Sequence, residues 1–111
     1  MVGKKEVEEA YEKIAPLISK TELEKSLHLS SDETEVFMKL ECHQRISRSY
    51  KIRGVMSKLL SLKEDEIRRG VTAVSSGNHG AALAYGGNLL GVERVEIFVP
   101  ETTPVPKVQK M

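Results

Sequence analysis

The stretch Val71-Thr-Ala-Val-Ser-Ser-Gly-Asn-His-Gly80 contains sequence patterns typical of a strand, a turn and the start of a helix, in that order. Its β-formers predict a strand over 71–75, the small and polar residues that follow predict a turn, and helical apolar spacing predicts a helix over 80–90. A strand that runs into the start of a helix places free backbone N–H groups at the positive end of the helix dipole. The stretch therefore predicts a strand–turn–helix unit with a site for a carboxylate or phosphate at the turn.

The turn is open to two interpretations. Ser75, Ser76 and Asn78 add side-chain donors, and Gly77 and Gly80 would let a ligand approach the backbone closely. Serine and asparagine are also ordinary helix caps, so the turn taken alone is equally compatible with a well-capped helix start. The glycine and lysine spacings of the dinucleotide fingerprint and of the P-loop are absent, which excludes those two phosphate sites.

The elements on either side alternate between helix and strand. Pro16 should end or kink the first helix, because proline lacks a backbone donor, and Gly70 should stop the charged run before the 71–75 strand. The alternation favours an α/β fold with a parallel sheet. The predicted elements are a helix from Glu6, a polar connection over 19–33, a strand over 35–41, helices over 49–62 and 80–90, a strand over 94–100, and the start of a helix over 103–111.

Composition excludes several classes of protein. The chain has 111 residues, 40% of them apolar and 30% charged, and a net charge of +1, which is typical of one compact domain with no general attraction to nucleic acid or anionic membranes. No stretch is apolar enough to cross a bilayer. Cys42 is the only cysteine, so an internal disulfide and a paired-thiolate zinc site are excluded, no metal site is expected, and a cytoplasmic location is predicted. Cys42 itself is expected to be buried after the strand over 35–41.

A second segment, Ser49-Tyr-Lys-Ile-Arg-Gly54, places Lys51 at the start of a predicted helix. A single lysine in such a position is ordinarily a surface charge. Here Tyr50 and Ile52 flank it, and apolar walls would disfavour the charged form of the amine, as carbonyl chemistry requires. Lys51 is therefore a candidate for covalent chemistry as well as for a surface charge.

Five short motifs together resemble those of a known family. They are Lys39-Leu-Glu41 with Gln44, Ser49 to Gly54, Ser75 to Gly80, Leu89-Leu-Gly91, and Pro100 to Pro104 with Lys107 and Val108. So spaced, they resemble the fold-type-II pyridoxal-phosphate enzymes, and most closely the threonine and serine dehydratases, from about Val7 to Met111. The resemblance implies the amino-terminal part of a three-layer, parallel-sheet α/β fold. It places residues 1–50 at the edge of the large cofactor domain and residues 51–111 at the start of a smaller, mobile domain.

The resemblance also implies a cofactor and roles for individual residues. Lys51 would hold pyridoxal 5'-phosphate as a Schiff base and move the substrate's α-proton. Tyr50 would lie against the pyridine ring, and Asn78 would donate a hydrogen bond to its phenolic oxygen. Ser76 matches a serine that acts as acid and base in relatives that racemise serine, so it is a second catalytic candidate. The substrate carboxylate would be bound by Ser75, Ser76, Gly77, Asn78 and His79.

The implied reaction is β-elimination on a small hydroxy amino acid, threonine or serine, giving a 2-keto acid and ammonia. Two alternatives stay open, namely a non-catalytic remnant or half-enzyme that needs a second chain, and serine racemase-like chemistry on the same scaffold. The partner would be a second copy or a complementing chain that covers exposed apolar sheet surface.

Three departures from the family pattern bear on activity. Glu41, Gln44 and Lys51 are spaced one residue wider than usual, so Ile46-Ser-Arg48 contains an insertion. Gly86 and Gly87 stand where small alanine-like residues are usual, and each helical glycine costs about 1 kcal/mol relative to alanine. The family's later phosphate-binding loop has no counterpart, so the chain is expected to be a fragment that binds the cofactor weakly.

Overall fold

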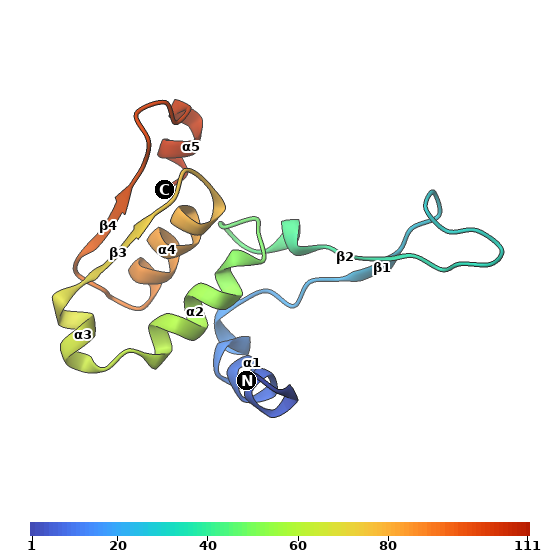
Figure 1. The fold of residues 1–111 in the computed structure, drawn as a ribbon, viewed down its shortest axis with the longest axis horizontal. Coiled ribbons are helices and arrows are strands. Elements are labelled where there is room, and N and C mark those ends of the chain that lie inside the picture. Colours follow the sequence, from blue (N-terminus) through green and yellow to red (C-terminus); the bar gives the residue numbers. More distant parts are fainter.

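A computed structural model describes residues 1–111 as two regions, a layered body and a projecting arm (Figure 1). The arm comprises residues 22–40. The body holds all five α-helices and one of the two sheets. Its elements are α1 (Lys4–Ile14), η1 (Ala15–Leu17), η2 (Glu41–His43), α2 (Lys51–Ser61), α3 (Glu64–Arg69), β3 (Val71–Val74), α4 (Asn78–Leu89), β4 (Val95–Phe98) and α5 (Val105–Gln109).

Strands β3 and β4 form the parallel sheet of the body, and α4 connects them. Val71 pairs with Val95 and Val74 with Phe98, so the two strands run side by side in the same direction. Alternate residues are half-buried and exposed along both strands, as expected for a sheet with one covered face. The predicted parallel α/β arrangement is therefore confirmed, and Val74 and Phe98 lie on the sheet's uncovered face.

The core lies between α2, α4 and the covered face of the sheet. Met56 is fully buried, Ile52 is nearly so, and Ile14 from the end of α1 joins them. Helical spacing explains this, because residues three and four apart share one face of α2. The same core thus takes residues from both sides of the predicted boundary at residue 50. Its other buried members are Val55, Leu59, Ala82 and Leu83.

The two glycines inside α4 permit close packing of neighbouring elements. A Cβ on Gly86 would lie 3.1 Å from Val55, and one on Gly87 would lie 2.5 Å from a methyl group of Val95. Real Cβ atoms essentially never come that close, so alanine cannot be placed there unless Val95 shifts. The propensity cost of these glycines is therefore offset by the close contacts that α4 makes with α2 and β4.

The arm corrects two expectations. Residues 19–33 were expected to form only a polar connection, but they contain β1 (Leu23–Lys25). The strand expected over 35–41 is present as β2 (Phe37–Lys39), yet it pairs antiparallel with β1 and does not join the parallel sheet. Hydrogen bonding between distant segments decided both outcomes, since Leu23 pairs with Lys39, and local spacing does not encode that pairing.

Several helix ends also differ from the expected positions. The first helix stops at Ile14 and continues as a 3₁₀ turn through Pro16, which agrees with the predicted interruption. Helix α4 begins at Asn78, two residues before the predicted start at Gly80. Cys42, expected to be buried, is exposed in η2 because β2 carries no core behind it.

Candidate functional site

Helices α2 and α4 run side by side in the same direction, which brings their N-terminal ends to one end of the body (Figure 1). His79, in the first turn of α4, lines the same hollow as Val55 in the second turn of α2. Further along both helices, Gly86 lies against Leu59. This parallel arrangement places Lys51 at the same end of the body as the turn that follows β3.

The hydroxyl of Ser75 caps the start of α4. Its Oγ accepts hydrogen bonds from the N–H groups of Gly80 at 3.0 Å and Gly77 at 3.3 Å. The capping interpretation is thus correct for Ser75. The backbone N–H groups of Ser76, Asn78 and His79 have no acceptor within the chain, so the α4 start keeps free donors for an anion.

Two lysines that we did not predict as site residues lie across from this helix start. Lys107 and Lys110 of the α5 region line one hollow with Gly77 and Asn78, and the Lys110 ammonium lies 3.4 Å from the Asn78 side-chain oxygen. Both charges favour a bound anion. The sequence shows both lysines in or next to a predicted helix. It does not show that this helix packs near the start of α4.

Lys51 is solvent-exposed at the first position of α2. Its ammonium lies 5.2 Å from the centre of the Tyr50 ring and takes part in no ion pair. Ile52 points into the core with 1% exposure, and Tyr50 is 60% exposed. Of the two expected apolar neighbours, only Tyr50 lies beside the amine, which stays open to solvent, so the expectation of a desolvated amine is wrong for this chain.

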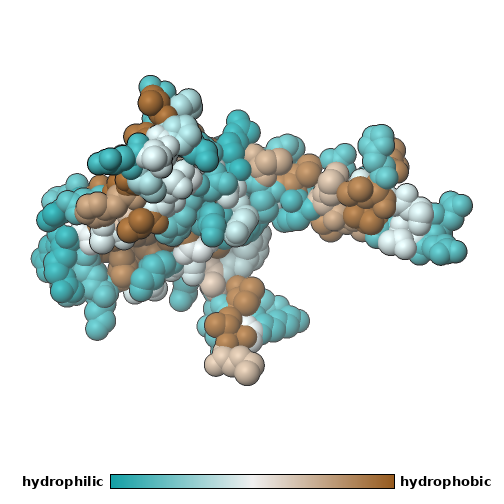
Figure 2. Space-filling model, turned by 45° about the horizontal axis from the view of Figure 1, so that its top comes forward, coloured by the Kyte–Doolittle hydropathy of each residue, from teal (hydrophilic) through white to brown (hydrophobic).

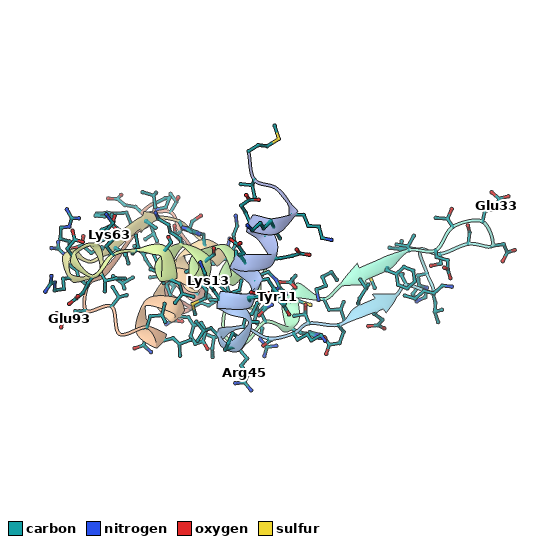
Figure 3. All side chains as sticks on the ribbon, turned by 90° about the horizontal axis from the view of Figure 1, so that it is seen from below. Tyr11, Lys13, Glu33, Arg45, Lys63 and Glu93 are labelled. Atoms are coloured by element: carbon teal, nitrogen blue, oxygen red, sulfur yellow. The ribbon has the colours of Figure 1, made fainter.

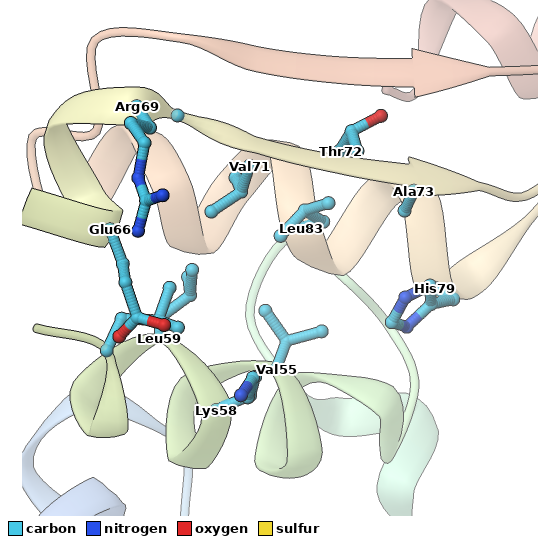
Figure 4. Close-up of a pocket in the computed structure, with 12 residues that line it drawn as sticks. Val55, Lys58, Leu59, Glu66, Arg69, Val71, Thr72, Ala73, His79 and Leu83 are labelled. Carbon is cyan, nitrogen blue, oxygen red and sulfur yellow. The ribbon is translucent and has the colours of Figure 1, made fainter.

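His79 faces a different space from Asn78. It borders a hollow of about 370 Å³ between α2, α3, β3 and α4, whose floor includes Val55 and Leu83 (Figure 4). Glu66 and Arg69 lie at the opposite end of that hollow (Figure 4). The five residues predicted to bind a carboxylate thus share one turn, but their side chains do not all face one space.

A network of hydrogen bonds joins the base of the arm to α2. Arg53 donates to both carboxylate oxygens of Glu41, at 2.9 and 2.7 Å. Thr21 and Gln44 also donate to Glu41, at 2.6 and 3.2 Å. Together these contacts lower the pKa of Glu41 from 4.5 to about 2, with the Arg53 hydrogen bonds as the largest cause, those from Thr21 and Gln44 adding to it, and partial burial opposing it.

These groups fit the chemistry that a phosphorylated aldehyde cofactor and an amino-acid substrate require. Lys51 offers a primary amine that is not engaged by any carboxylate. The α4 start offers uncommitted N–H donors, with Lys107 beside them. No group of three or more His, Cys, Asp or Glu side chains is arranged to hold a metal ion, and no helix is long and apolar enough to span a membrane.

The fold and this site define the class as an α/β unit of the kind found in fold-type-II enzymes. A family model described as "Pyridoxal-phosphate dependent enzyme" matches residues 14–111, and the chain belongs to this family. The family is pyridoxal-phosphate dependent, as its description states.

Individual relatives are similar along nearly the whole chain. The biosynthetic L-threonine dehydratase of Staphylococcus saprophyticus is 34% identical over 99% of the chain, and the catabolic L-threonine dehydratase of Staphylococcus aureus is 39% identical over 94%. These matches cover 26% and 30% of the two enzymes. The structure of maize serine racemase superposes with a TM-score of 0.85 and 32% identity, covering 94% of this chain and 31% of that one. The chain thus spans about a quarter to a third of the length of these relatives.

Proposed function

We propose that this chain supplies the amino-terminal part of a pyridoxal-phosphate-dependent dehydratase that converts threonine or serine into a 2-keto acid and ammonia, the water lost in the elimination being taken up again on hydrolysis. The observation that carries the proposal is the parallel packing of α2 and α4, which brings Lys51 and the turn after β3 to one end of the body. The two threonine dehydratases that match nearly the whole chain support the same reaction class.

We propose a separate chemical role for each group of residues in the site. When bound, pyridoxal phosphate would supply an electron sink for the loss of the α-proton. Lys51 would attach the cofactor through its amine and accept that proton, with Tyr50 beside the ring and Asn78 donating to its phenolic oxygen. The free N–H groups at the start of α4 would bind the substrate carboxylate, and the Ser75 cap would hold them in place.

The same proposal covers the surroundings of the site. We propose that residues 1–50 belong to the edge of a large cofactor domain and residues 51–111 to a smaller domain, with the protein working in the cytoplasm. The shared core of Ile14 and Met56 means that the two parts contact each other in this structure. Movement between them would therefore require α1 to separate from α2.

The test is to attach the cofactor chemically and locate it. The purified chain is mixed with pyridoxal phosphate, reduced with borohydride and mapped by peptide mass spectrometry. Label on Lys51 is expected, and its loss in Lys51→Arg but not in Lys58→Arg, an exposed lysine of the same helix, supports the proposal. Equal labelling of the Lys51→Arg chain would refute it. Keto acid formation from threonine and serine then measures turnover.

Racemisation is a second candidate because maize serine racemase superposes closely on the chain. Ser76 is exposed in the turn, where its hydroxyl is free to act as the second acid and base. Chiral chromatography after incubation with L-serine and pyridoxal phosphate distinguishes the two reactions. Formation of D-serine by the unaltered chain, but not by Ser76→Ala, would favour racemisation. Formation of keto acid without D-serine would favour elimination.

A complementing half-enzyme is the remaining candidate, favoured by the exposed sheet face. Val74 and Phe98 are 78% and 60% exposed on a sheet of two strands. Such a face is expected to associate with a second copy or with a chain that completes the sheet. Size-exclusion chromatography of the chain, with Phe98→Ser as the variant, measures that tendency. A concentration-independent monomer would exclude association of this chain with itself.

A further inference from the structure

The Glu41–Arg53 pair differs from every other ion pair in the chain. Its side chains are 28% exposed for Arg53 and 17% for Glu41, whereas each of the other pairs leaves both partners at least 44% exposed. Exposed pairs contribute little to stability, because solvent screens them. A shielded, two-donor contact has a more fixed geometry, since both guanidinium N–H groups must be aligned with the carboxylate.

The position of the pair links it to Lys51. Arg53 lies two residues after Lys51 in the first turn of α2, and Glu41 lies in η2, outside that helix. The pair therefore fixes the first turn of α2 against a separate segment of the chain. Thr21, which is 5% exposed, donates to the same carboxylate and ties the base of the arm to it.

The loop between Glu41 and Arg53 has an irregular backbone. Ile46 and Arg48 have positive φ angles of 56° and 51°, which is unusual for any residue with a side chain and strained for a β-branched one. This irregular loop coincides with the inserted residue inferred from the sequence. Gln44 anchors the loop before the irregularity, exchanging hydrogen bonds with the backbone of Ser19 at 3.0 and 3.1 Å.

From these contacts we propose that Glu41 and Arg53 are positioning residues, which hold the first turn of α2 so that the Lys51 amine faces the turn after β3 despite the irregular loop. The proposal rests on the role of Lys51 in the proposed function. Neither Glu41 nor Arg53 has to touch the cofactor or the substrate. Their effect would pass through the backbone of 51–53, because Lys51 and Arg53 belong to the same helical turn.

The test uses the whole chain and two independent measurements. Backbone amide hydrogen exchange is followed for 51–53 and for the core helix positions Leu59 and Ala82. In Arg53→Met, exchange at 51–53 is expected to rise by about tenfold, corresponding to the loss of about 1.4 kcal/mol of local stability, with Leu59 and Ala82 unchanged. Borohydride-trapped pyridoxal phosphate is then expected to shift from Lys51 toward Lys58.

Matched variants separate positioning from general stability. Arg94→Met breaks an exposed pair with Glu96 and should leave both measurements unchanged. Arg53→Lys keeps the charge but not the two-donor contact, so it should restore only part of the selectivity for Lys51. The double exchange of Glu41→Arg with Arg53→Glu should restore more selectivity than either single change.

Each outcome is decisive. Unchanged exchange at 51–53 in Arg53→Met, or an equal rise there and at Ala82, would overturn the positioning role. If pyridoxal phosphate never labels Lys51 in the unaltered chain, the proposed function fails, while the exchange data still report whether the pair fixes the helix. Label that stays on Lys51 in Arg53→Met would also overturn the positioning role.

Discussion

The body and the arm use apolar side chains in opposite ways. In the body, apolar residues of α2 and α4 are buried against one another, whereas in the arm Leu23, Leu27 and Phe37 are 66%, 85% and 52% exposed. Figure 2 shows hydrophobic side chains spread over the surface of the arm, and Figure 3 shows how far its tip at Glu33 lies from Lys63 and Glu93 at the other end of the body. The site helices therefore share a packed core, whereas the apolar side chains of the arm have no cover within this chain.

The largest expected effect compares two methionines, one from each region. Met56 is fully buried in the body, and Met38 in the arm is 39% exposed. Met56→Ala should lower the free energy of unfolding by about 2 to 5 kcal/mol, because it removes buried surface and leaves a cavity. Met38→Ala should change it by less than about 0.5 kcal/mol. Urea unfolding of both variants measures the difference, and equal losses would mean that the arm is as well packed as the body.

The next effect tests how tightly α4 packs, using two glycines that both lie inside helices. Gly87→Ala should destabilise the chain by about 1 to 3 kcal/mol, because its Cβ would lie 2.5 Å from Val95. Gly54→Ala meets no atom within 4 Å and should stabilise α2 by up to about 1 kcal/mol. Thermal unfolding followed by circular dichroism checks both signs. Stabilisation in both variants would show that β4 can move away from α4.

The sequence predicted the elements of the body better than those of the arm. Helical spacing from Ile52 to Leu59 predicted α2 and its buried face, since that pattern depends only on residues close in the chain. The strand at β1 was missed because a three-residue strand is defined by its partner, 12 to 16 positions away in register pairs such as Leu23 with Lys39. Local pattern thus encodes the body's elements, while the arm's structure depends on pairing.

The candidate site shows the same division. The cap at Ser75 and the free donors after it follow from the residues of one turn, so they could be anticipated. The approach of Lys110 to Asn78 depends on how the elements fold back, and it was not anticipated. The exposure of Lys51 agrees with the surface-charge alternative, which the sequence could not separate from the catalytic one. The role of Lys51 itself rests on the family resemblance and stays a prediction until it is labelled.

A smaller effect concerns the junction of the two regions, where pH acts on Glu41. Its pKa is lowered from 4.5 to about 2 by its hydrogen bonds, so its contribution to stability is fully present above pH 4.5 and is lost as the pH falls toward 2. The expected loss is about 1 to 2 kcal/mol, because solvent still screens part of the interaction. Urea unfolding between pH 5 and 2 should be less pH-dependent in Glu41→Gln than in the unaltered chain or in Glu96→Gln, whose pair is exposed. The same slope in all three would exclude this assignment.

The smallest effect on stability is expected at the arm, where the consequence should be association instead. Leu27 and Leu29 are 85% and 64% exposed, so replacing both with serine removes little buried surface and should change the free energy of unfolding by less than about 0.5 kcal/mol. Their exposure should nevertheless favour contacts between chains, because apolar surface is driven out of water. Sedimentation velocity over a range of concentrations should show less association for the double variant. Unchanged association would show that the chains associate through another surface. The exposed face of the body sheet at Val74 and Phe98 is the next candidate, and Phe98→Ser tests it directly.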